Sequence, residues 1–417
     1  MILTLWLLLG LPGASRAEDW PRWRGPRGDG TWKGPAIPPK WPPQGPPVVW
    51  KQQLGPGYSG ITEAEGRVFT LDRPWQDAAQ KTPGDAERIV CLDAATGALL
   101  WQHRYSANYE KVDYGKGPRC TPTMHDGRVY TLGAVGHVHC LEAASGREIW
   151  SLDLVKEKRA KIPEWGLAAS PVIQGDLVIL HGGVPGACYL GLNRFTGQEI
   201  WRAGDDPAGY ATPILIDHAG VRQLVGWTPL HVLGIRATDG KILWKIPYKV
   251  TYGVSIATPI FQDGVVLVCG YWEGSKAIQL GAQPDQAEIL WEENTFLRGL
   301  MDPPLYRDGY GYLLDKQHGL VGFSLKDGKK LWMDGRLTPR GRNPQVSLVW
   351  LGESQRAIAL NEKGELTLLE LTPRGLTEHS RAKIVGDTWA HPAYAGEFAY
   401  ARDDEQIVCV KLTAPNP

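Results

Sequence analysis

The sequence predicts an all-β protein, an eight-bladed β-propeller built from four-stranded antiparallel blades. A phrase that ends in tryptophan recurs at intervals of roughly 40 to 50 residues, the period typical of propeller blades. Glycine and proline are abundant, with 50 and 32 residues among 417, so the chain must contain many turns. The 18 tryptophans far outnumber the six phenylalanines, which indicates that tryptophan holds a recurring structural position.

The recurring phrase predicts the outer half of each blade. Its copies are CLDAATGALLW, CLEAASGREIW, GLNRFTGQEIW, GIRATDGKILW, GAQPDQAEILW and GFSLKDGKKLW, which end at Trp101, Trp150, Trp201, Trp244, Trp291 and Trp332. A second phrase such as ASPVIQGDLVILHG precedes most copies and indicates a strand, a tight turn and a strand. In the third unit we expect strands near 170–174, 177–182, 188–193 and 198–202. The short links are rich in glycine, aspartate and asparagine, as antiparallel hairpins require.

The tryptophan of each phrase is expected to dock between neighbouring blades. A blade is one twisted sheet and cannot bury both of its faces alone, so an indole wedged between outer strands would close the gap. A role for these rings as sugar or quinone platforms is disfavoured, because outer strands lie far from the centre of a propeller. The expected docking residues are Trp50, Trp101, Trp150, Trp201, Trp244, Trp291 and Trp332.

The two ends of the chain are expected to share the last blade. A seventh unit keeps the strand rhythm but lacks the tryptophan, and the residues up to Leu412 supply only three more strands. An open outer edge is a feature that proteins avoid. The segment PPVVWKQQL, residues 46–54, looks like an outer strand with Trp50 in the docking place. We therefore expect strand Val48–Lys51 to close the ring, with seven blades as the alternative.

Residues 1–17 resemble a secretory signal peptide. The apolar core Ile2–Leu11 is too short to span a bilayer, and Ser15 and Ala17 are small residues suited to cleavage after Ala17. The mature chain is then expected to be exported, periplasmic or extracellular, without a transmembrane segment. An uncleaved membrane anchor is the alternative.

Residues 18–47 form a segment rich in tryptophan, arginine, glycine and proline. The propeller follows at residues 48–412, and residues 413–417 form a short tail. The amino-terminal segment contains DWPRWRGPRGDGTW. We expect a structural latch lying along the propeller, with Trp20, Trp23 and Trp32 buried and its arginines paired or extended toward water. A partner-binding tail and a membrane-surface anchor are the alternatives.

Charge and motifs exclude several classes of function. Lys and Arg equal Asp and Glu at 45 each, so the basic excess of a nucleic-acid binder is missing. Three of the six cysteines, Cys91, Cys140 and Cys409, occupy equivalent repeat positions and are expected to be small buried residues. We find no catalytic nucleophile, phosphate-binding or dinucleotide motif. His137 and His139 alternate on one strand, but two ligands make a weak site, so no metal site is predicted.

A binding site is expected at the rim of the central channel, where each innermost strand begins. The residues before these strands offer aromatic rings, cations and a few acceptors. They suit a planar ligand, a polyol or an anionic peptide. The alternative is that they plug the channel and bond to water and backbone. The candidates are Tyr58, Arg119, Trp165, Tyr210, Tyr252, Arg298, Asp302, Arg342, Asn343, Trp389 and His391. The segments Arg73–Ala86 and Tyr105–Pro118 are unusually long, and the part NYEKVDYGKGP, residues 108–118, is expected to overhang one face.

The phrase LDAATGALLW and its relatives resemble the repeat of the pyrroloquinoline-quinone (PQQ) propeller family. The resemblance covers residues 48–412, and the opening WPRWRGPRGDG resembles a segment that precedes such propellers in exported planctomycete-type proteins. One branch of the family oxidises alcohols or sugars with PQQ and calcium, and its alcohol-oxidising members carry adjacent cysteines that are absent here. The other branch is non-catalytic, like the outer-membrane β-barrel assembly lipoprotein, whose lipidated cysteine is also absent.

These features favour an exported, monomeric, non-catalytic scaffold that binds a protein or polysaccharide of the cell envelope and needs no cofactor. The alternative is a quinoprotein oxidoreductase with PQQ and calcium in the channel and a carboxylate such as Asp302 as base. A sugar-binding module is a third possibility.

Overall fold

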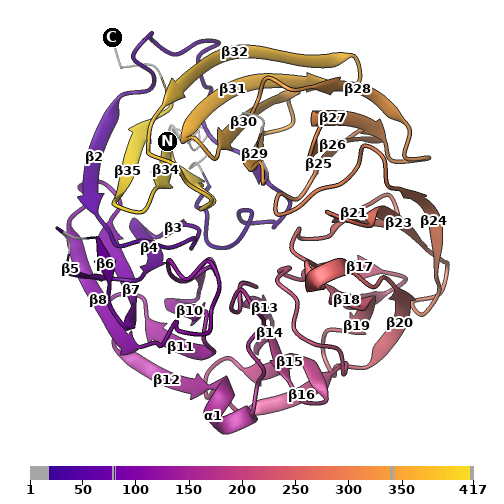
Figure 1. Cartoon of the computed structure of the whole chain (residues 1–417), viewed down its shortest axis with the longest axis horizontal. Coiled ribbons are helices and arrows are strands. Elements are labelled where there is room, and N and C mark those ends of the chain that lie inside the picture. The colour runs from indigo at the N-terminus through magenta and orange to yellow at the C-terminus, as the bar shows by residue number, and fades with distance from the viewer. Residues whose placement is uncertain (1–17, 78, 80, 339–340, 342, 414–417) are drawn as a thin grey trace, which may run out of the picture.

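The computed structural model describes residues 18–413, except 78, 80, 339, 340 and 342, and shows eight β-sheets arranged in a ring (Figure 1). We number the sheets as blades 1 to 8 in chain order. The eight-bladed propeller predicted from the sequence is confirmed. The predicted signal peptide, residues 1–17, lies outside the described residues, as does most of the tail.

In each blade the first strand lies near the axis and the last lies at the periphery (Figure 1). Blades 1 to 4 comprise β3 (Thr62–Ala64), β4 (Arg67–Asp72), β7 (Ala86–Asp93) and β8 (Leu99–Ser106); β9 (Thr123–His125), β10 (Arg128–Leu132), β11 (His137–Glu142) and β12 (Glu148–Asp153); β13 (Val172–Gln174), β14 (Leu177–Val184), β15 (Ala187–Asn193) and β16 (Glu199–Ala203); and β17 (Ile214–His218), β18 (Val221–Trp227), β19 (His231–Arg236) and β20 (Ile242–Pro247).

Blades 5 to 8 follow the same order, with two additions from the amino-terminal segment. They comprise β21 (Ile260–Gln262), β22 (Val265–Gly270), β23 (Gly274–Leu280) and β24 (Ala287–Glu293); β25 (Leu305–Arg307), β26 (Tyr310–Asp315), β27 (Gly319–Ser324) and β28 (Lys330–Asp334); β1 (Thr31–Trp32), β29 (Val346–Leu351), β30 (Arg356–Asn361), β31 (Glu365–Thr372) and β32 (Gly375–Lys383); and β33 (Ala393–Ala395), β34 (Phe398–Arg402), β35 (Gln406–Lys411) and β2 (Val48–Gln53).

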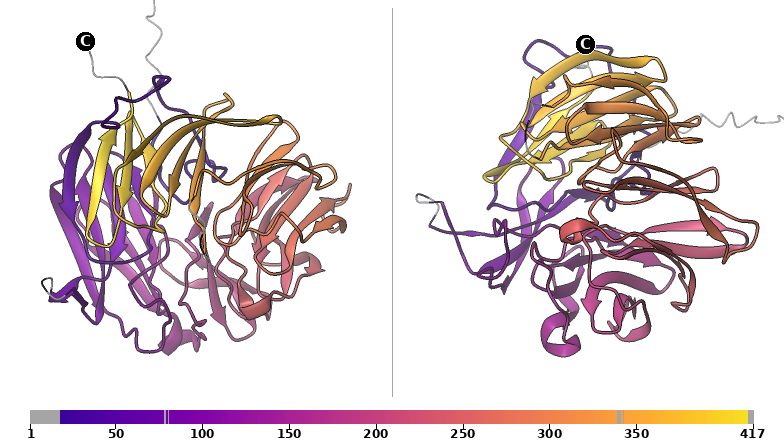
Figure 2. Two further views of the ribbon diagram at one scale, coloured as in Figure 1. Left: turned by 45° about the horizontal axis from the view of Figure 1, so that its top comes forward. Right: turned by 45° about the vertical axis from the view of Figure 1, so that its right-hand side comes forward.

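Three small elements decorate the ring. The hairpin of β5 (Trp75–Asp77) and β6 (Thr82–Pro83) projects from blade 1 (Figure 2). Helix α1 (Leu154–Lys158) follows blade 2, and the 3-10 helix η1 (Thr251–Gly253) precedes blade 5. Within the described residues, no helix has the length and hydropathy needed to cross a membrane.

In blades 1 and 3 a side chain sets the turn between the third and fourth strands. In blade 1 the Asp93 Oδ1 accepts hydrogen bonds from the backbone N–H groups of Ala95 and Thr96, at 3.1 and 2.8 Å. Asn193 makes the equivalent bonds in blade 3. Gly97 then adopts a φ of 73°, a conformation that most side chains resist. This explains why the phrases of blades 1 and 3 carry Asp or Asn four residues before the glycine.

The docking tryptophans lie between blades, as the repeat predicts. Trp50, Trp101 and Trp150 are buried, and each indole Nε1 donates to a carbonyl of the next blade. The acceptors are Ala94, Ala143 and Arg194, at 2.9, 3.0 and 3.0 Å. Trp291 and Trp332 donate in the same way to the carbonyl oxygens of Leu325 and Thr372. Trp201 and Trp244 are buried at the corresponding places.

Trp41 supplies the ring that blade 7 lacks. Its indole is buried, and Nε1 donates to the Leu412 carbonyl oxygen at 3.3 Å. Leu412 follows β35 as Ala94 follows β7, so this bond matches the one that Trp50 makes with blade 1. The backbone N–H of Trp41 also bonds to Ser380 on β32. The amino-terminal segment thus restores a contact that the seventh repeat has lost.

The two ends of the chain close the ring in one sheet. Strand β2 pairs antiparallel with β35, with Val48 opposite Val410 and Lys51 opposite Val408 (Figures 1 and 2). This pairing confirms the predicted closure and excludes the seven-bladed alternative.

Residues 18–32 of the amino-terminal segment cross the central channel (Figure 1). Trp20 pairs with Glu63 of blade 1, and β1 runs parallel to β29 of blade 7. Trp20 and Trp32 are buried, at 3% and 1% exposure, whereas Trp23 is only partly buried. Arg27 forms an ion pair with Glu18, at 2.7 Å.

All six cysteines are buried and present as free thiols. Burial raises the pKa of the Cys91 and Cys409 thiols to about 12. These side chains therefore pack as small neutral groups between strands.

Candidate functional site

A cavity of about 270 Å³ opens at the face of the ring where the innermost strands begin. Its lining includes eight aromatic side chains that we call the aromatic bowl: Tyr58, Tyr114, Trp165, Tyr210, Tyr252, Tyr271, Trp272 and Trp389. Most of them stand in the links between successive blades. The pair Tyr271 and Trp272 comes instead from the link between β22 and β23.

Five of the rings form a continuous arc around one side of the bowl. Tyr58 stacks on Trp389 with a centroid distance of 5.5 Å, and Trp389 lies 5.7 Å from Tyr114. Trp165 lies between Tyr114 and Tyr210, at 6.4 and 5.4 Å. These contacts hold the rings in fixed orientations, so a ligand would meet a preformed surface.

A second, shorter arc is more exposed. Trp272 lies 4.8 Å from Tyr271 and 6.2 Å from Tyr252. The Lys316 ammonium sits 4.5 and 4.4 Å from the ring centroids of Tyr271 and Trp272. Tyr252 is 73% exposed and Trp272 45%. Exposed aromatic rings that gather on one concave surface are typical of a recognition site.

Arg119 is the cation of the bowl lining, and its position is fixed. Its Nη2 donates to the carbonyl oxygens of Asp113 and Tyr114, at 2.9 and 2.8 Å. The guanidinium also lies 5.4 Å from the Tyr58 ring centroid. Burial lowers the pKa of Arg119. The tether to the backbone holds a positive charge beside the long arc.

Trp23 and His391 form the floor of the bowl. Their ring centroids lie 4.3 Å apart, and the Trp23 Nε1 donates to Thr258 Oγ1 at 2.8 Å. Burial lowers the pKa of His391 to about 3, so this imidazole is neutral near pH 7. Trp23 also lines a second cavity, of about 510 Å³, on the other side of the amino-terminal segment. The segment therefore divides the channel.

Asp302 lies beneath the floor. Its Oδ2 accepts the backbone N–H of Val346 at 2.8 Å, and its Oδ1 is 3.8 Å from His391 Nε2. Burial raises the pKa of this carboxyl well above its ordinary value. Asp302 does not belong to the bowl lining, so its position does not suit the role of base toward a ligand in the bowl.

The structure brings most of the candidate rim residues together. Those that line the cavity are Tyr58, Arg119, Trp165, Tyr210, Tyr252, Asn343, Trp389 and His391. Arg298 instead forms an ion pair with the buried Asp315, at 3.0 Å. Arg342 lies outside the described residues.

Sequence reasoning missed four of the lining aromatic residues. Tyr114 belongs to the segment 108–118 that was expected to overhang a face, but no repeat position marks it. Tyr271 and Trp272 occupy a link between strands of one blade, which the search at strand starts did not cover. Trp23 was expected only as part of a latch.

The donor set of the bowl does not fit PQQ with calcium. Calcium takes six to eight oxygen ligands, commonly from carboxylates. Among the described residues, the bowl lining contains no aspartate or glutamate. The lining offers aromatic faces, one guanidinium and neutral polar groups, which suit the stacking of a neutral or weakly anionic ligand.

Comparisons with known proteins place the chain in a family. The model of the family described as outer membrane protein assembly factor BamB matches residues 47–203 and 85–333. The outer membrane protein assembly factor BamB of Yersinia pestis is 22% identical over 317 residues, which cover 72% of this chain and 74% of the relative. A quinoprotein alcohol dehydrogenase of Pseudomonas putida is 24% identical over 246 residues, 53% of this chain and 37% of that enzyme.

Solved structures show the same fold in both kinds of protein. BamB from Moraxella catarrhalis superposes with a TM-score of 0.62 at 16% identity, covering 89% of this chain and 99% of that one. The quinohemoprotein alcohol dehydrogenase of Comamonas testosteroni gives 0.67 at 13% identity, covering 97% and 82%. Because the family model spans more than half of the sequence, the chain belongs to the PQQ-like propeller family described as outer membrane protein assembly factor BamB.

Proposed function

We propose that this protein is a non-catalytic scaffold of the cell envelope whose aromatic bowl binds a protein or a polysaccharide. The observation that carries the proposal is the lining of the bowl. It consists of aromatic rings in mutual contact and Arg119, and no aspartate or glutamate occurs among its described residues. The family description and the signal-like residues 1–17 support a place in the envelope.

The geometry suits a partner that offers flat apolar faces. Such faces occur on sugar rings and on the apolar or aromatic side chains of an extended peptide, and both stack on indole and phenol rings. Arg119 would add an attraction for a carboxylate or hydroxyl of the partner.

Retention experiments with a bowl variant test this proposal. Purified protein is immobilised and exposed to envelope extract and, separately, to a glycan array. We expect wild-type protein to retain a partner that the double variant Trp165→Ala, Trp389→Ala does not retain. The control is Phe195→Ala, which removes an aromatic ring in the turn between β15 and β16 that is 38% exposed and does not line the bowl. Equal retention by all three proteins would count against the bowl.

The fold likeness to quinoprotein dehydrogenases defines the competing function. Purified protein is mixed with PQQ and Ca²⁺, and its melting temperature and its reduction of a dye in the presence of alcohols or sugars are measured. Our proposal expects neither quantity to change. A higher melting temperature together with dye reduction would establish an oxidoreductase instead.

A further inference from the structure

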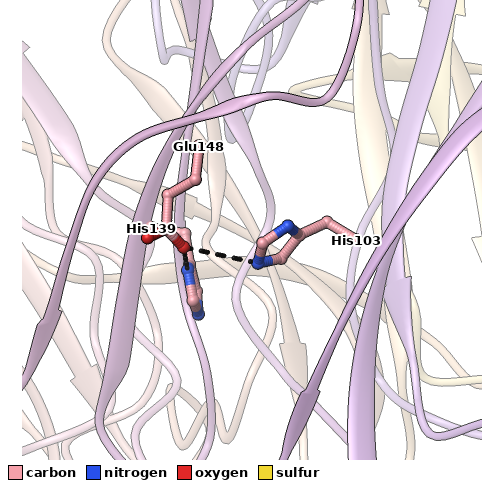
Figure 3. A group of neighbouring side chains, drawn as sticks. All are labelled: His103, His139 and Glu148. Atoms are coloured by element: carbon pink, nitrogen blue, oxygen red, sulfur yellow. Dashed lines mark hydrogen bonds and ion pairs between the residues drawn. The ribbon is translucent and has the colours of Figure 1, made fainter.

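Three potential metal ligands meet between the outer strands of blades 1 and 2, away from the aromatic bowl. His103 lies on β8, His139 on β11 and Glu148 on β12, and their side chains point toward one another (Figure 3). His137, the other histidine of β11, does not join them. Its Nε2 lies 3.6 Å from Asp153 Oδ2. The sequence pattern paired His139 with the wrong histidine because its true neighbour comes from another blade.

The distances suit a small cation. Glu148 Oε2 lies 3.0 Å from His139 Nδ1 and 3.5 Å from His103 Nε2. All three ligand atoms lie within 4.8 Å of one another. Zn²⁺ bonds to imidazole nitrogen and carboxylate oxygen are about 2.0–2.2 Å long, which places neighbouring ligand atoms roughly 3–3.5 Å apart. Two of the three pairs already have this separation, so only a small movement of one imidazole is required.

The surroundings hold the ligands and leave one side open. Glu148 Oε1 accepts a hydrogen bond from Ser151 Oγ at 2.8 Å, which orients the carboxylate. The His139 ring is buried against Tyr105, with a centroid distance of 4.3 Å, whereas Glu148 is exposed. Within the described part of the chain, the ion-pair partners of Glu148 are these two histidines, without a lysine or arginine. A cation would therefore find an oriented carboxylate that no other fixed charge neutralises.

We propose that His103, His139 and Glu148 form a binding site for a divalent transition-metal ion of the zinc type, which links blade 1 to blade 2. Two imidazoles and one carboxylate with an open position are a recurrent ligand set for Zn²⁺ and related ions. An ion bound only by the folded chain stabilises the native state by mass action. The site lies on the outer strands, so this inference does not depend on the proposed function of the bowl.

Zinc titration of the full-length protein tests the site. The protein is first treated with EDTA and dialysed, and Zn²⁺ is then titrated by calorimetry while the melting temperature is followed in parallel. We expect one ion per chain and a melting temperature that rises with Zn²⁺ concentration. Each of the variants His103→Ala, His139→Ala and Glu148→Gln should weaken binding by about tenfold or more, since even loss of an outer-sphere partner has effects of that size.

The matched control is His137→Ala, which removes a neighbouring histidine from the same strand and should leave the zinc affinity unchanged. Melting curves in EDTA establish that each variant is folded. His103→Ala should disturb the fold least, because the His103 ring is partly exposed. The inference is overturned if folded wild-type protein binds no Zn²⁺, if His103→Ala and Glu148→Gln keep the wild-type affinity, or if His137→Ala loses binding to the same extent.

Discussion

At the scale of single residues, an indole nitrogen and a carbonyl oxygen join several pairs of neighbouring blades. The sequence was sufficient to predict these docking tryptophans, because each stands at the same place in its repeat. It was not sufficient to predict the role of Trp41, which lies outside any repeat and whose indole donates a hydrogen bond to the Leu412 carbonyl oxygen in the same way. Its role depends on a neighbour more than 300 residues away, and a local pattern cannot reveal such a contact.

Replacing a docking tryptophan should destabilise the whole propeller. Trp201 is 6% exposed and fills the space over Gly191 of its own blade and Gly240 of the next. We expect Trp201→Ala to lower the free energy of unfolding by about 3–5 kcal/mol, because it leaves a large cavity between blades. Denaturant unfolding measures this change. Ile200→Ala, at a neighbouring side chain that is 56% exposed, is the control and should change stability little. An unchanged midpoint for Trp201→Ala would refute the docking role.

His181 should make the fold sensitive to acid. The ring is buried, its Nε2 accepts the N–H of Gly209 at 3.0 Å, and its Nδ1 donates to the Ala211 carbonyl oxygen at 3.3 Å. Burial lowers the pKa of His181 from 6.5 to about 4. As the pH falls through 6.5, the unfolded chain binds a proton that the folded chain does not bind. Stability is therefore lost between pH 6.5 and about 4, by up to about 1.4 kcal/mol per pH unit.

Chemical unfolding at several pH values, with His181→Gln as the comparison, measures this contribution. The variant should show a pH dependence that is shallower by about one proton across this range. Curves of equal slope for the two proteins would show that His181 does not govern it.

At the scale of elements, the closing strand β2 supplies the fourth and outermost strand of blade 8. Its role was predicted from residues 46–54 because that segment matches an outer strand in pattern and because three strands remained at the other end of the chain. The path of residues 18–32 through the channel was not predicted. The composition of this segment predicted a latch lying along the propeller, but it could not give the path, because tertiary contacts set the course of the chain.

Proline substitutions in β2 test whether a single hydrogen bond between β2 and β35 contributes to closing the ring. Leu54 donates its N–H to the Glu405 carbonyl, so alternate residues of β2 face β35 and Gln52 should donate as well. Gln52→Pro should destabilise the protein by about 3 kcal/mol, since it removes this bond from the closing pair. Gln53→Pro is the control, because its N–H points away from the sheet. Thermal unfolding distinguishes the two variants, and equal midpoints would show that this strand does not secure the ring.

At the scale of the whole molecule, the aromatic bowl exists only because the ring is closed. Its rings come from residues as far apart in sequence as Tyr58 and Trp389, which the propeller brings to a stacking distance of 5.5 Å. The repeat was enough to predict that residues before the innermost strands converge. It could not predict that Arg298 would turn away to pair with Asp315, or that Trp23 would cross the channel to form the floor. Those outcomes depend on the packing of neighbouring blades.

The measurement that tests the central claim most directly is the affinity of a retained partner for the bowl. Calorimetry with that partner compares wild-type protein with Trp165→Ala and with the Phe195→Ala control. A buried aromatic contact at the centre of an interface commonly contributes about 2 kcal/mol or more, so Trp165→Ala should raise the dissociation constant roughly thirtyfold while the control leaves it unchanged. Equal dissociation constants for Trp165→Ala and wild type would contradict the account.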